Sequence, residues 1–405
     1  MGHGWQWLMR AGWVLALLSL YACRSEPPGA PKLESLSQLL PPQVDLIDDF
    51  DRTSLQLALQ QSLDYLRQLP PNRIVPLAGR QLTVSTLHDT LETFAQVLAQ
   101  TPTFDALHRA LDTQFELVQA AGRNGQGSML FTGYYEAVLR GSPVPTDQYT
   151  YPLYSRPDDL LHIDLAHFRP EWSGERLIAR YDKGQVLPYF TRHEIDIEGK
   201  LRGRRLELVW LPDIVDGFFL HIQGSGRIHL TNGQSMRVNY AASNGHPYRS
   251  IGTLLLDEGR LSPNAISMQR LRDYLRTNPE DRYRVMTHNP RYIFFRQVDR
   301  GPVGSLGLTL VPGRSVALDP RIFPPAGLAF IRTQQPVLDA KHQVVGWKPM
   351  HRFVFNHDTG SAITGPGRLD VFWGSGAAAE AAAGHLKHEG VLVFLLKRSA
   401  PKTPQ

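Results

Sequence analysis

The sequence predicts a mainly β protein with an α-helical N-terminal part, on three observations. Helical spacing of apolar residues dominates residues 55–120. From residue 128 the chain changes to short apolar runs separated by turns, which is the pattern of strands in a small barrel. Gly (34) and Pro (30) together make up about 16% of the 405 residues, which favours a turn-rich body over a helical bundle.

Three helices are expected before residue 121. The first begins behind Thr53 or Ser54 as its N-cap and places leucines at positions 55, 59, 63 and 66 on one face. The same apolar spacing predicts helices over 86–99 and 104–120, the last ending before Gly122. We expect these helices to be scaffold.

Strand-type runs dominate the rest of the chain. A helix that begins at Ser262-Pro263 and stops at Asn278-Pro279, and an Ala-rich helix near 376–386, lie among them. The predicted strand segments are 128–139, 149–156, 205–211, 216–230, 235–243, 291–298, 307–320, 328–333, 351–363, 368–374 and 391–397.

Composition excludes several classes of protein. Hydrophobic residues at 42% and charged residues at 20% rule out wholesale disorder, and the length suggests two or three domains. The net charge is +5, but no basic run is interleaved with aromatic residues, so we expect no nucleic-acid partner. A mildly basic surface would suit an acidic polymer. A single cysteine excludes both a disulfide framework and a cysteine-based zinc site.

The N-terminus is predicted to be a targeting segment. Residues 1–22 form a signal peptide, in which Arg10 precedes an apolar stretch too short to span a bilayer. The segment ends in LYAC, which resembles a bacterial lipobox, so Cys23 is the predicted lipidation site and residues 23–45 a Pro-rich linker. The alternative is an ordinary signal peptide with an incidental cysteine. Arg24, where an Asp would mark retention, implies by the same resemblance transfer to the outer membrane.

The usual catalytic motifs are absent from the sequence. It contains no GxSxG elbow, HExxH pair or P-loop, and its fifteen histidines have no metal-ligand spacing. We therefore predict neither a metal site nor a cofactor. Carboxylates near glycine-rich turns remain, above all in HDTGSAITGPGRLDVFWG (357–374).

Strand alternation sorts the residues of RLDVFWG (368–374). It places Leu369 and Val371 on a packed face, and Asp370 with Arg368 and Phe372 on the other. An unperturbed Asp is protonated about one time in a thousand at pH 7, so a general acid there requires a raised pKa. Apolar Phe372 would raise that pKa and Arg368 would lower it, and the sequence leaves the balance open.

Two other aspartates stand at strand ends. Asp358 ends an apolar run before Thr359-Gly360, a position that suits both a turn or capping role and a catalytic role, and the sequence leaves both open. Asp319 precedes a proline, which favours a turn-forming role. Glu136 is expected at a surface position of its strand.

Several long motifs, in order, carry a resemblance to a known family. They are FTGYYEA (131–137), HIQGSGR (221–227), VNYAASNGHPYRSIG (238–252), NPRYIFFR (289–296), SVALDP (315–320) and DTGSAITGPGRLDVFWG (358–374). Through them the chain resembles the membrane-bound lytic murein transglycosylase A family over essentially its whole mature length.

The resemblance implies a fold and a reaction. The expected fold is a double-ψ β-barrel domain, formed with the N-terminal helices by residues 46–138 and 285–398, and a smaller β-barrel domain inserted as residues 139–284, with a groove between them. The expected reaction cleaves the β-1,4 bond between N-acetylmuramic acid and N-acetylglucosamine in peptidoglycan and leaves a 1,6-anhydro-muramyl end. The expected location is the periplasmic face of the outer membrane, with its lipid and cell-wall synthesis or hydrolysis proteins as partners.

The resemblance also implies residue roles. Asp370 matches the family's single catalytic acid and base, while Asp358 and Asp319 match the other two aspartates of the three-aspartate module and are carried over as supporting residues.

Substrate-binding residues are predicted from the need for aromatic faces and polar groups around sugars. Tyr134, Tyr135, Gln223 and Ser225 are the candidates, completed by Gly226 in QGSG and by Arg368 beside Asp370. The alternative is that the tyrosines are half-buried barrel residues and QGSG only a turn.

Two other functions remain open at this point. One is a hydrolase of β-1,4 glycans that uses Asp358 and Asp370 as two carboxylates. The other is a non-catalytic peptidoglycan-binding lipoprotein, because double-ψ barrels also serve as binding modules.

Overall fold

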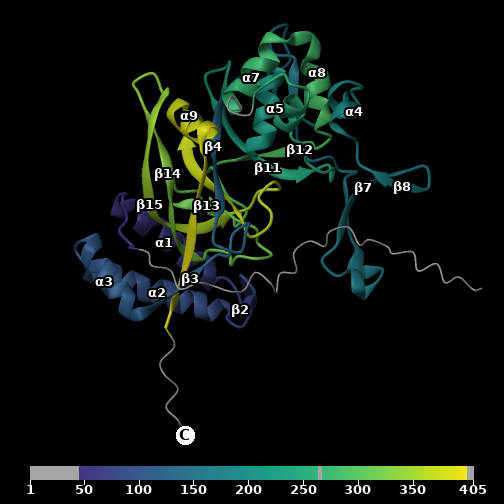
Figure 1. The fold of residues 1–405 in the computed structure, drawn as a ribbon. Coiled ribbons are helices and arrows are strands. Elements are labelled where there is room, and N and C mark those ends of the chain that lie inside the picture. The colour runs from purple at the N-terminus through teal and green to yellow at the C-terminus, as the bar shows by residue number, and fades with distance from the viewer. Residues whose placement is uncertain (1–44, 263–266, 399–405) are drawn as a thin grey trace, which may run out of the picture.

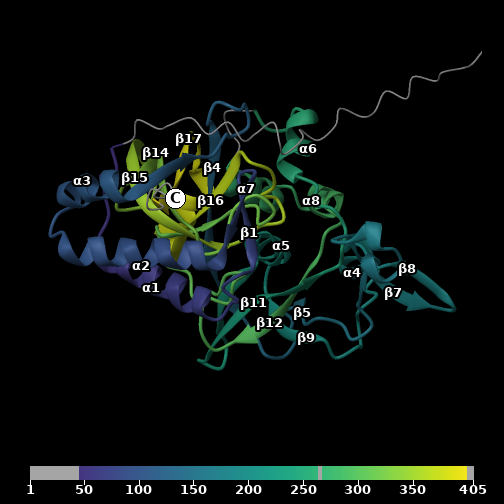
Figure 2. The same ribbon diagram turned by 90° about the horizontal axis from the view of Figure 1, so that it is seen from below.

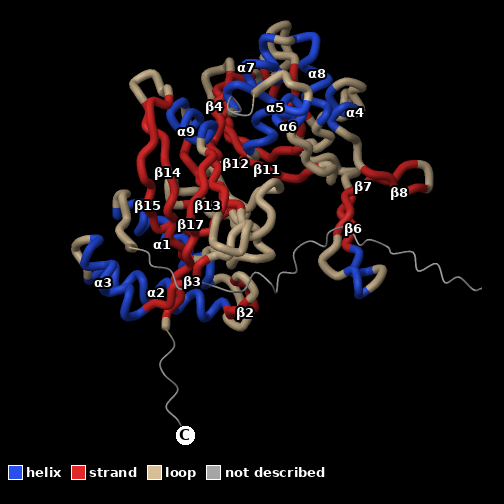
Figure 3. Tube along the Cα trace, viewed as in Figure 1, coloured by secondary structure: helices blue, strands red, loops and turns tan. Residues whose placement is uncertain are grey.

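The computed structural model describes residues 45–262 and 267–398. The predicted signal peptide, Cys23 and almost all of the linker lie outside the described residues. Two β-structured bodies stand side by side, and three N-terminal helices pack beneath the first of them (Figures 1 and 3). The predicted fold class, mainly β with an α-helical N-terminal part and two barrels, is confirmed.

The N-terminal helices are α1 (Arg52–Arg67), α2 (Val84–Gln100) and α3 (Phe104–Gln114), with the hairpin of β1 (Ile74–Leu77) and β2 (Arg80–Thr83) between the first two. Figure 2 shows α1 and α2 running side by side along the first barrel.

Two details of the predicted helices are wrong. The N-cap of α1 is Asp51, whose carboxylate accepts a 2.7 Å hydrogen bond from the Ser54 amide. The third helix ends at Gln114, because the next residues form β3 (Phe115–Gln119) and pair with β17. Pairing with a distant strand here overrides a locally helical apolar spacing.

The first barrel is a closed ring of six strands. Around the ring the order is β4–β16–β13–β15–β14–β17, and β17 closes it by pairing antiparallel with β4. The β4–β16 and β13–β15 pairs are parallel and the rest antiparallel. Its strands are β4 (Met129–Gly141), β13 (Ser315–Ala317), β14 (Leu328–Leu338), β15 (Val344–Asp358), β16 (Arg368–Ser375) and β17 (Lys387–Lys397).

The inserted body is a second ring that shares β4. The parallel pair β4–β10 leads to β11 and β12, and the bridges Ser155–Phe295 and Ser142–Trp210 join β5 and β9 into the ring. Its strands are β5 (Tyr151–Tyr154), β9 (Glu207–Leu211), β10 (Ser225–Leu230), β11 (Ser235–Ser243) and β12 (Ile293–Val298). Because β4 belongs to both rings, the chain limits given for the two domains stay a prediction.

Short helices and a three-stranded arm surround the insert. The arm projects away from the body in Figure 1 and is made of β6 (Leu161–Asp164), β7 (Arg176–Asp182) and β8 (Gln185–Pro188). The helices are α4 (Arg192–Asp196), α5 (Ile214–Gln223), α6 (Ile251–Asp257), α7 (Met268–Thr277) and α8 (Pro279–His288); α9 (Ala377–His385), as predicted near 376–386, packs on β4.

Two of these helices correct the predicted elements. The segment predicted as one strand over 216–230 is helix α5 followed by β10, with Gly224 at φ +77° as the helix C-cap. Both faces of α5 are buried, so its apolar run has no visible 3.6-residue period. Helix α7 begins at Met268 with Ser267 as its N-cap, whereas Pro263 lies outside the described residues.

The cores follow the two rings. One apolar core joins α1–α3 to the first barrel, so segments far apart in sequence are buried together; Leu55, Phe94, Val316 and Phe353 are members. A second core fills the insert around Tyr135, and Trp373 packs against both. The two bodies therefore meet along β4 and β16.

Candidate active site

A cleft of about 930 Å³ lies between the two rings. Its barrel side is formed by the ends of β13, β15 and β16 and by the loops 303–310 and 359–364. Its insert side comes from the end of α5 and from β10, β11 and the approach to β12. All three predicted aspartates line it.

Strand register brings Asp358 and Asp370 to the same face. Ala317 of β13 pairs with Asp358 on one neighbouring strand and with Asp370 on the other, and Asp370 pairs in turn with Thr132 of β4. Residues directly opposite each other in paired strands point to the same face. With strands about 4.8 Å apart, the two aspartates are separated by roughly two strand spacings.

Asp370 projects into the cleft, in agreement with its predicted alternation. Leu369 and Val371 are fully buried in the barrel core, while the Asp370 side chain keeps 20% of its surface exposed. Phe372 lies on the Asp370 face but is buried, with its ring centroid 5.2 Å from that of Tyr134.

The surroundings of Asp370 raise its pKa and so increase the fraction that is protonated near neutral pH. Its Oδ1 accepts a hydrogen bond from the Thr132 hydroxyl, and the nearest guanidinium nitrogen, of Arg368, is 4.0 Å away. Burial raises the pKa of Asp370 to about 6; Arg368 opposes this rise and the nearby charge of Asp358 adds to it. The balance that the sequence left open is thus decided by burial.

Asp358 is held by the backbone. Its Oδ1 accepts 2.8 Å hydrogen bonds from the amides of Ser305 and Thr359, which ties the loops 303–310 and 359–364 to the end of β15. Burial still raises the pKa of Asp358, against the effect of these amides. Asp358 therefore has the turn role that the sequence offered and also lines the cleft, while its catalytic role stays a prediction.

Tyr134 lies beside both aspartates. Its hydroxyl is buried next to the Asp358 carboxylate, and hydrogen bonding between the two groups opposes the rise in the pKa of Asp358. Burial, with the charges of Asp358 and Asp370, raises the pKa of Tyr134 well above its ordinary value, so the phenol is a neutral hydrogen-bond donor.

Asp319 has a different environment. It is 1% exposed, and its carboxylate accepts hydrogen bonds from the backbone and side chain of Arg321 and a 2.8 Å bond from the Gly365 amide. Burial alone would raise the pKa of Asp319, but these donors outweigh it and the pKa is lowered. Asp319 is therefore ionised, and its hydrogen bond to Gly365 links the chain after β13 to the loop before β16.

The other predicted substrate residues divide into two groups. Gln223 and Ser225 line the cleft beside Tyr134. Tyr135 and Gly226 do not line the cleft. Tyr135 is buried in the insert core, because alternation sends it to the face opposite Tyr134. Gly226 of β10 packs closely against Leu220 of α5. Arg368 donates a 3.2 Å hydrogen bond to the Thr132 hydroxyl rather than lining the cleft.

Sequence reasoning missed several residues that line the cleft. Asn239, Tyr240, Arg291 and Arg296 line its insert side, and loop 303–310 lines its barrel side. The motifs VNYAAS and NPRYIFFR contained these residues, but no spacing rule separates a cleft arginine from a surface one.

Glu136 corrects another expectation. It was expected at the surface, but it is 1% exposed and forms ion pairs with Arg227 at 3.2 Å and Arg237 at 3.3 Å. The strand β4 continues from one ring into the other, so both of its faces are covered at this point.

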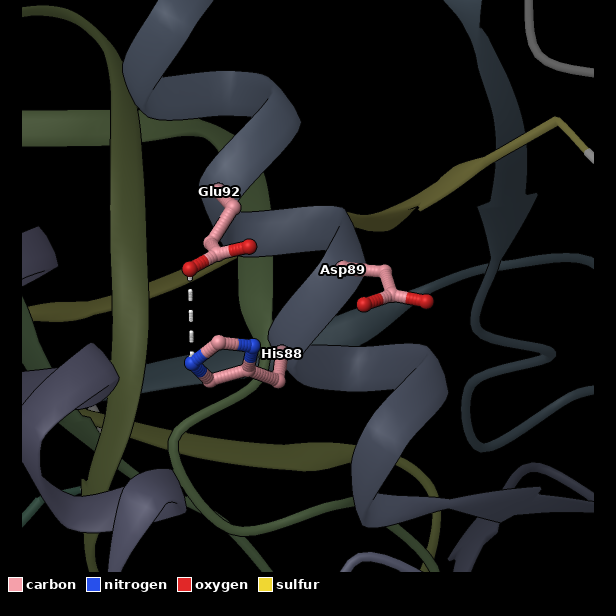
Figure 4. Close-up of side chains that lie close together, drawn as sticks. All are labelled: His88, Asp89 and Glu92. Carbon is pink, nitrogen blue, oxygen red and sulfur yellow. Dashed lines mark ion pairs between the residues drawn. The ribbon is translucent and has the colours of Figure 1, made fainter.

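One group of potential metal ligands occurs among the described residues. His88, Asp89 and Glu92 of α2 have ligand atoms within 4.8 Å of one another, and Figure 4 shows them on the helix surface. The two carboxylates are exposed, and none of the three residues lines the cleft. This group belongs to the scaffold helices, away from the aspartates.

Comparison with protein families finds two matches. Residues 130–296 match the MltA specific insert domain, and residues 314–396 match the 3D domain. The second match contains Asp319, Asp358 and Asp370, and the first contains the insert side of the cleft.

Individual proteins are similar over most of the chain. A curated relative, the membrane-bound lytic murein transglycosylase A of Vibrio cholerae, is 31% identical over 280 residues, which cover 68% of this chain and 67% of the relative. A crystal structure of a membrane-bound lytic murein transglycosylase from Agrobacterium tumefaciens is 34% identical with a TM-score of 0.71, covering 86% of this chain and 93% of that one. A crystal structure of MltA from Neisseria gonorrhoeae is 32% identical with a TM-score of 0.64, covering 86% and 88%.

Proposed function

The chain belongs to the membrane-bound lytic murein transglycosylase A family, and on that premise we propose that it cleaves the β-1,4 bond between N-acetylmuramic acid and N-acetylglucosamine of peptidoglycan, with Asp370 as the single acid and base. Action on murein as a lytic transglycosylase follows from the family. The bond, the anhydro product and the residue roles are the finer part of the proposal.

One observation carries the role of Asp370. It is a cleft carboxyl whose pKa burial raises to about 6, so about one molecule in ten holds the proton at pH 7. An unperturbed Asp would hold it about a hundred times less often. This makes Asp370 a usable general acid near neutral pH.

In the first step Asp370 gives its proton to the glycosidic oxygen. The bond from that oxygen to C1 of the muramyl sugar then breaks, and positive charge develops on C1 and the ring oxygen. Asp358 lies two strands away on the same face, where its carboxylate would stabilise this charge when ionised.

In the second step the sugar's own 6-hydroxyl attacks C1. A bond forms between O6 and C1, and the hydroxyl proton passes to the Asp370 carboxylate, which restores the acid. The nucleophile is already part of the bound substrate, and intramolecular reactions reach effective molarities of about 10⁵–10⁸ M. The walls of the cleft favour this route over attack by water.

The other predicted residues either line the cleft where the glycan would bind or hold the loops and side chains around Asp370. Tyr134 offers its buried hydroxyl, and Gln223 and Ser225 line the cleft beside it. Asp319 holds the loop that carries Gly365 and so supports the approach to β16. Arg368 orients the Thr132 hydroxyl that binds Asp370.

Location is the second part of the proposal. No helix in the described ranges is long and apolar enough to cross a bilayer. The relatives are named membrane-bound, and we propose attachment to the outer membrane, on its periplasmic face, by lipid at Cys23. Mass spectrometry of the mature N-terminus tests this, and an unmodified Cys23 thiol would contradict it.

The decisive experiment is product analysis. Purified mature protein is incubated with sacculi, and the released fragments are identified by mass spectrometry. We expect 1,6-anhydro-muramyl ends, formed equally well in EDTA. Reducing ends would identify a two-carboxylate hydrolase, and binding without any cleavage would identify a non-catalytic lipoprotein.

A further inference from the structure

The insert wall of the cleft carries two arginines that lack a carboxylate partner. Arg291 and Arg296 line this wall, and neither forms an ion pair with any acidic residue in the described ranges 45–262 and 267–398. Arg321, on the opposite wall, is paired with Asp319 at 2.7 Å. The two insert arginines are therefore cations that face the cleft without neutralisation.

Arg291 is the more enclosed of the two. Its Nη1 donates a 3.3 Å hydrogen bond to the His246 carbonyl, while its Nε is buried without a partner among the described residues. Burial lowers the pKa of the Arg291 guanidinium, which expresses the cost of enclosing an unpaired cation; the nearby Tyr240 opposes this effect. A bound anion would remove that cost.

Arg296 is the open neighbour. It lies on β12 opposite Asn239 of β11, and Phe295 before it points into the insert core. Alternation therefore sends the Arg296 side chain to the cleft face, where it is exposed. Arg291 and Arg296 thus both line this wall, and a guanidinium group can bind a carboxylate through two parallel hydrogen bonds.

We propose that Arg291 and Arg296 form a carboxylate-binding subsite for the acidic substituent of the muramyl sugar; this inference rests on the proposed function. Muramic acid carries a lactyl ether on C3 of the same ring whose C1 bond is broken. That carboxyl is either free or linked to a stem peptide with carboxylates of its own. A ring held with C1 at Asp370 has its acidic substituent about one sugar width away, within the same cleft.

The charges of the two cleft walls set the orientation of the acidic substituent of the bound sugar. Asp358 and Asp370 occupy the barrel wall, so an acidic substituent there would meet like charge. On the insert wall it would meet Arg291 and Arg296. The subsite thus distinguishes a muramyl sugar, which is acidic, from N-acetylglucosamine, which is neutral, and sets which sugar is cut.

The test compares anionic and neutral glycans. Equilibrium binding of the full mature protein and its variants Arg291→Ala, Arg291→Lys and Arg296→Ala is measured with three probes: stem-free glycan strands with free lactyl carboxylates, soluble strands that keep their stems, and neutral chitohexaose. Arg300→Ala, an exposed arginine outside the cleft lining, is the matched control. Binding is read on the Asp370→Asn background, so that no probe is consumed.

We expect each Ala variant to weaken binding of acidic strands by about tenfold, chitohexaose and the Arg300→Ala control to be unaffected, and Arg291→Lys to retain part of the affinity. Loss confined to stem-free strands assigns the lactyl carboxylate, and loss confined to stem-bearing strands assigns a stem carboxylate; both support the subsite. Equal losses for chitohexaose, or no loss for either acidic probe, would overturn it. Because the readout is binding, a failure of the proposed cleavage reaction is seen separately, in the product analysis.

Discussion

Asp319 and Asp370 line the same cleft, but their pKa values depart in opposite directions from that of an ordinary aspartate. Asp319 is 1% exposed, yet its pKa is lowered, because Arg321 and the Gly365 amide donate hydrogen bonds that outweigh the effect of burial. The Asp370 side chain is 20% exposed, yet burial raises its pKa to about 6, and only Arg368, whose nearest nitrogen is 4.0 Å away, opposes this rise. A guanidinium bonded directly to the carboxylate, as Arg321 is to Asp319, thus separates the structural anion from the proton donor.

The largest expected effect comes from removing the proton donor. Asp370→Asn keeps the shape of the side chain but cannot cycle a proton, so cleavage of sacculi should fall by about 10²–10⁴-fold. Asp358→Asn is the comparison variant and should lose less, partly as stability. A near-native rate for Asp370→Asn beside an inactive, well-folded Asp358→Asn would exchange the two roles.

Folding of Asp370→Asn is expected to be intact, for a reason that depends on pH. A carboxyl whose folded pKa is raised contributes stability that is fully present below about pH 4 and is lost as pH rises through about 6. The variant should therefore equal or exceed the wild type in melting temperature at pH 8, and this advantage should vanish at low pH.

The next effect concerns the structural anion. Asp319→Asn removes a charged acceptor shared by Arg321 and Gly365, and should lower the free energy of unfolding by about 1.5–3 kcal/mol at pH 7, as measured by urea denaturation. Because the pKa of Asp319 is lowered, its stabilisation is present above about pH 4 and is lost as pH falls further. Asp147→Asn, at an exposed site, is the control and should stay within about 0.5 kcal/mol. Equal losses of unfolding free energy in Asp319→Asn and Asp147→Asn would show that Asp319 is not a stabilising structural anion.

The smallest effect concerns the cation beside the proton donor. For the wild type, kcat/KM should fall about tenfold per pH unit above pH 6, as the Asp370 acid ionises. Arg368→Gln removes the group that lowers this pKa, so the fall should begin at a higher pH, with a roughly threefold smaller relative loss at pH 8. An unchanged profile would show that Arg368 is too well screened by solvent to act on Asp370.

The sequence predicted the parts of this site that depend on local alternation. Period-two patterning placed Asp370 away from the core beside buried Leu369 and Val371, and the register of β13 confirmed that face. Patterning failed where pairing with distant strands decides the outcome. Phe115 starts a strand because β17 lies alongside it, and α5 has no simple apolar stripe because most of its residues are buried.

The remaining parts depend on long-range proximity. No local sequence pattern indicates that the Gly365 amide donates a hydrogen bond to Asp319, or that the Ser305 amide donates one to Asp358. The same holds for Arg291 and Arg296, whose place on the cleft wall follows from the way the insert ring folds against the first barrel. Their chemistry could be read from the sequence, but their neighbours could not.

The most direct test of the central claim is the titration of Asp370 itself. Carboxyl ¹³C NMR of the free protein, with Asp370→Asn used to assign the signal, reports the pKa of this one group. We predict a midpoint at about 6, raised by burial in the cleft. A midpoint at or below the ordinary aspartate value of about 3.9 would contradict the assignment of Asp370 as the general acid.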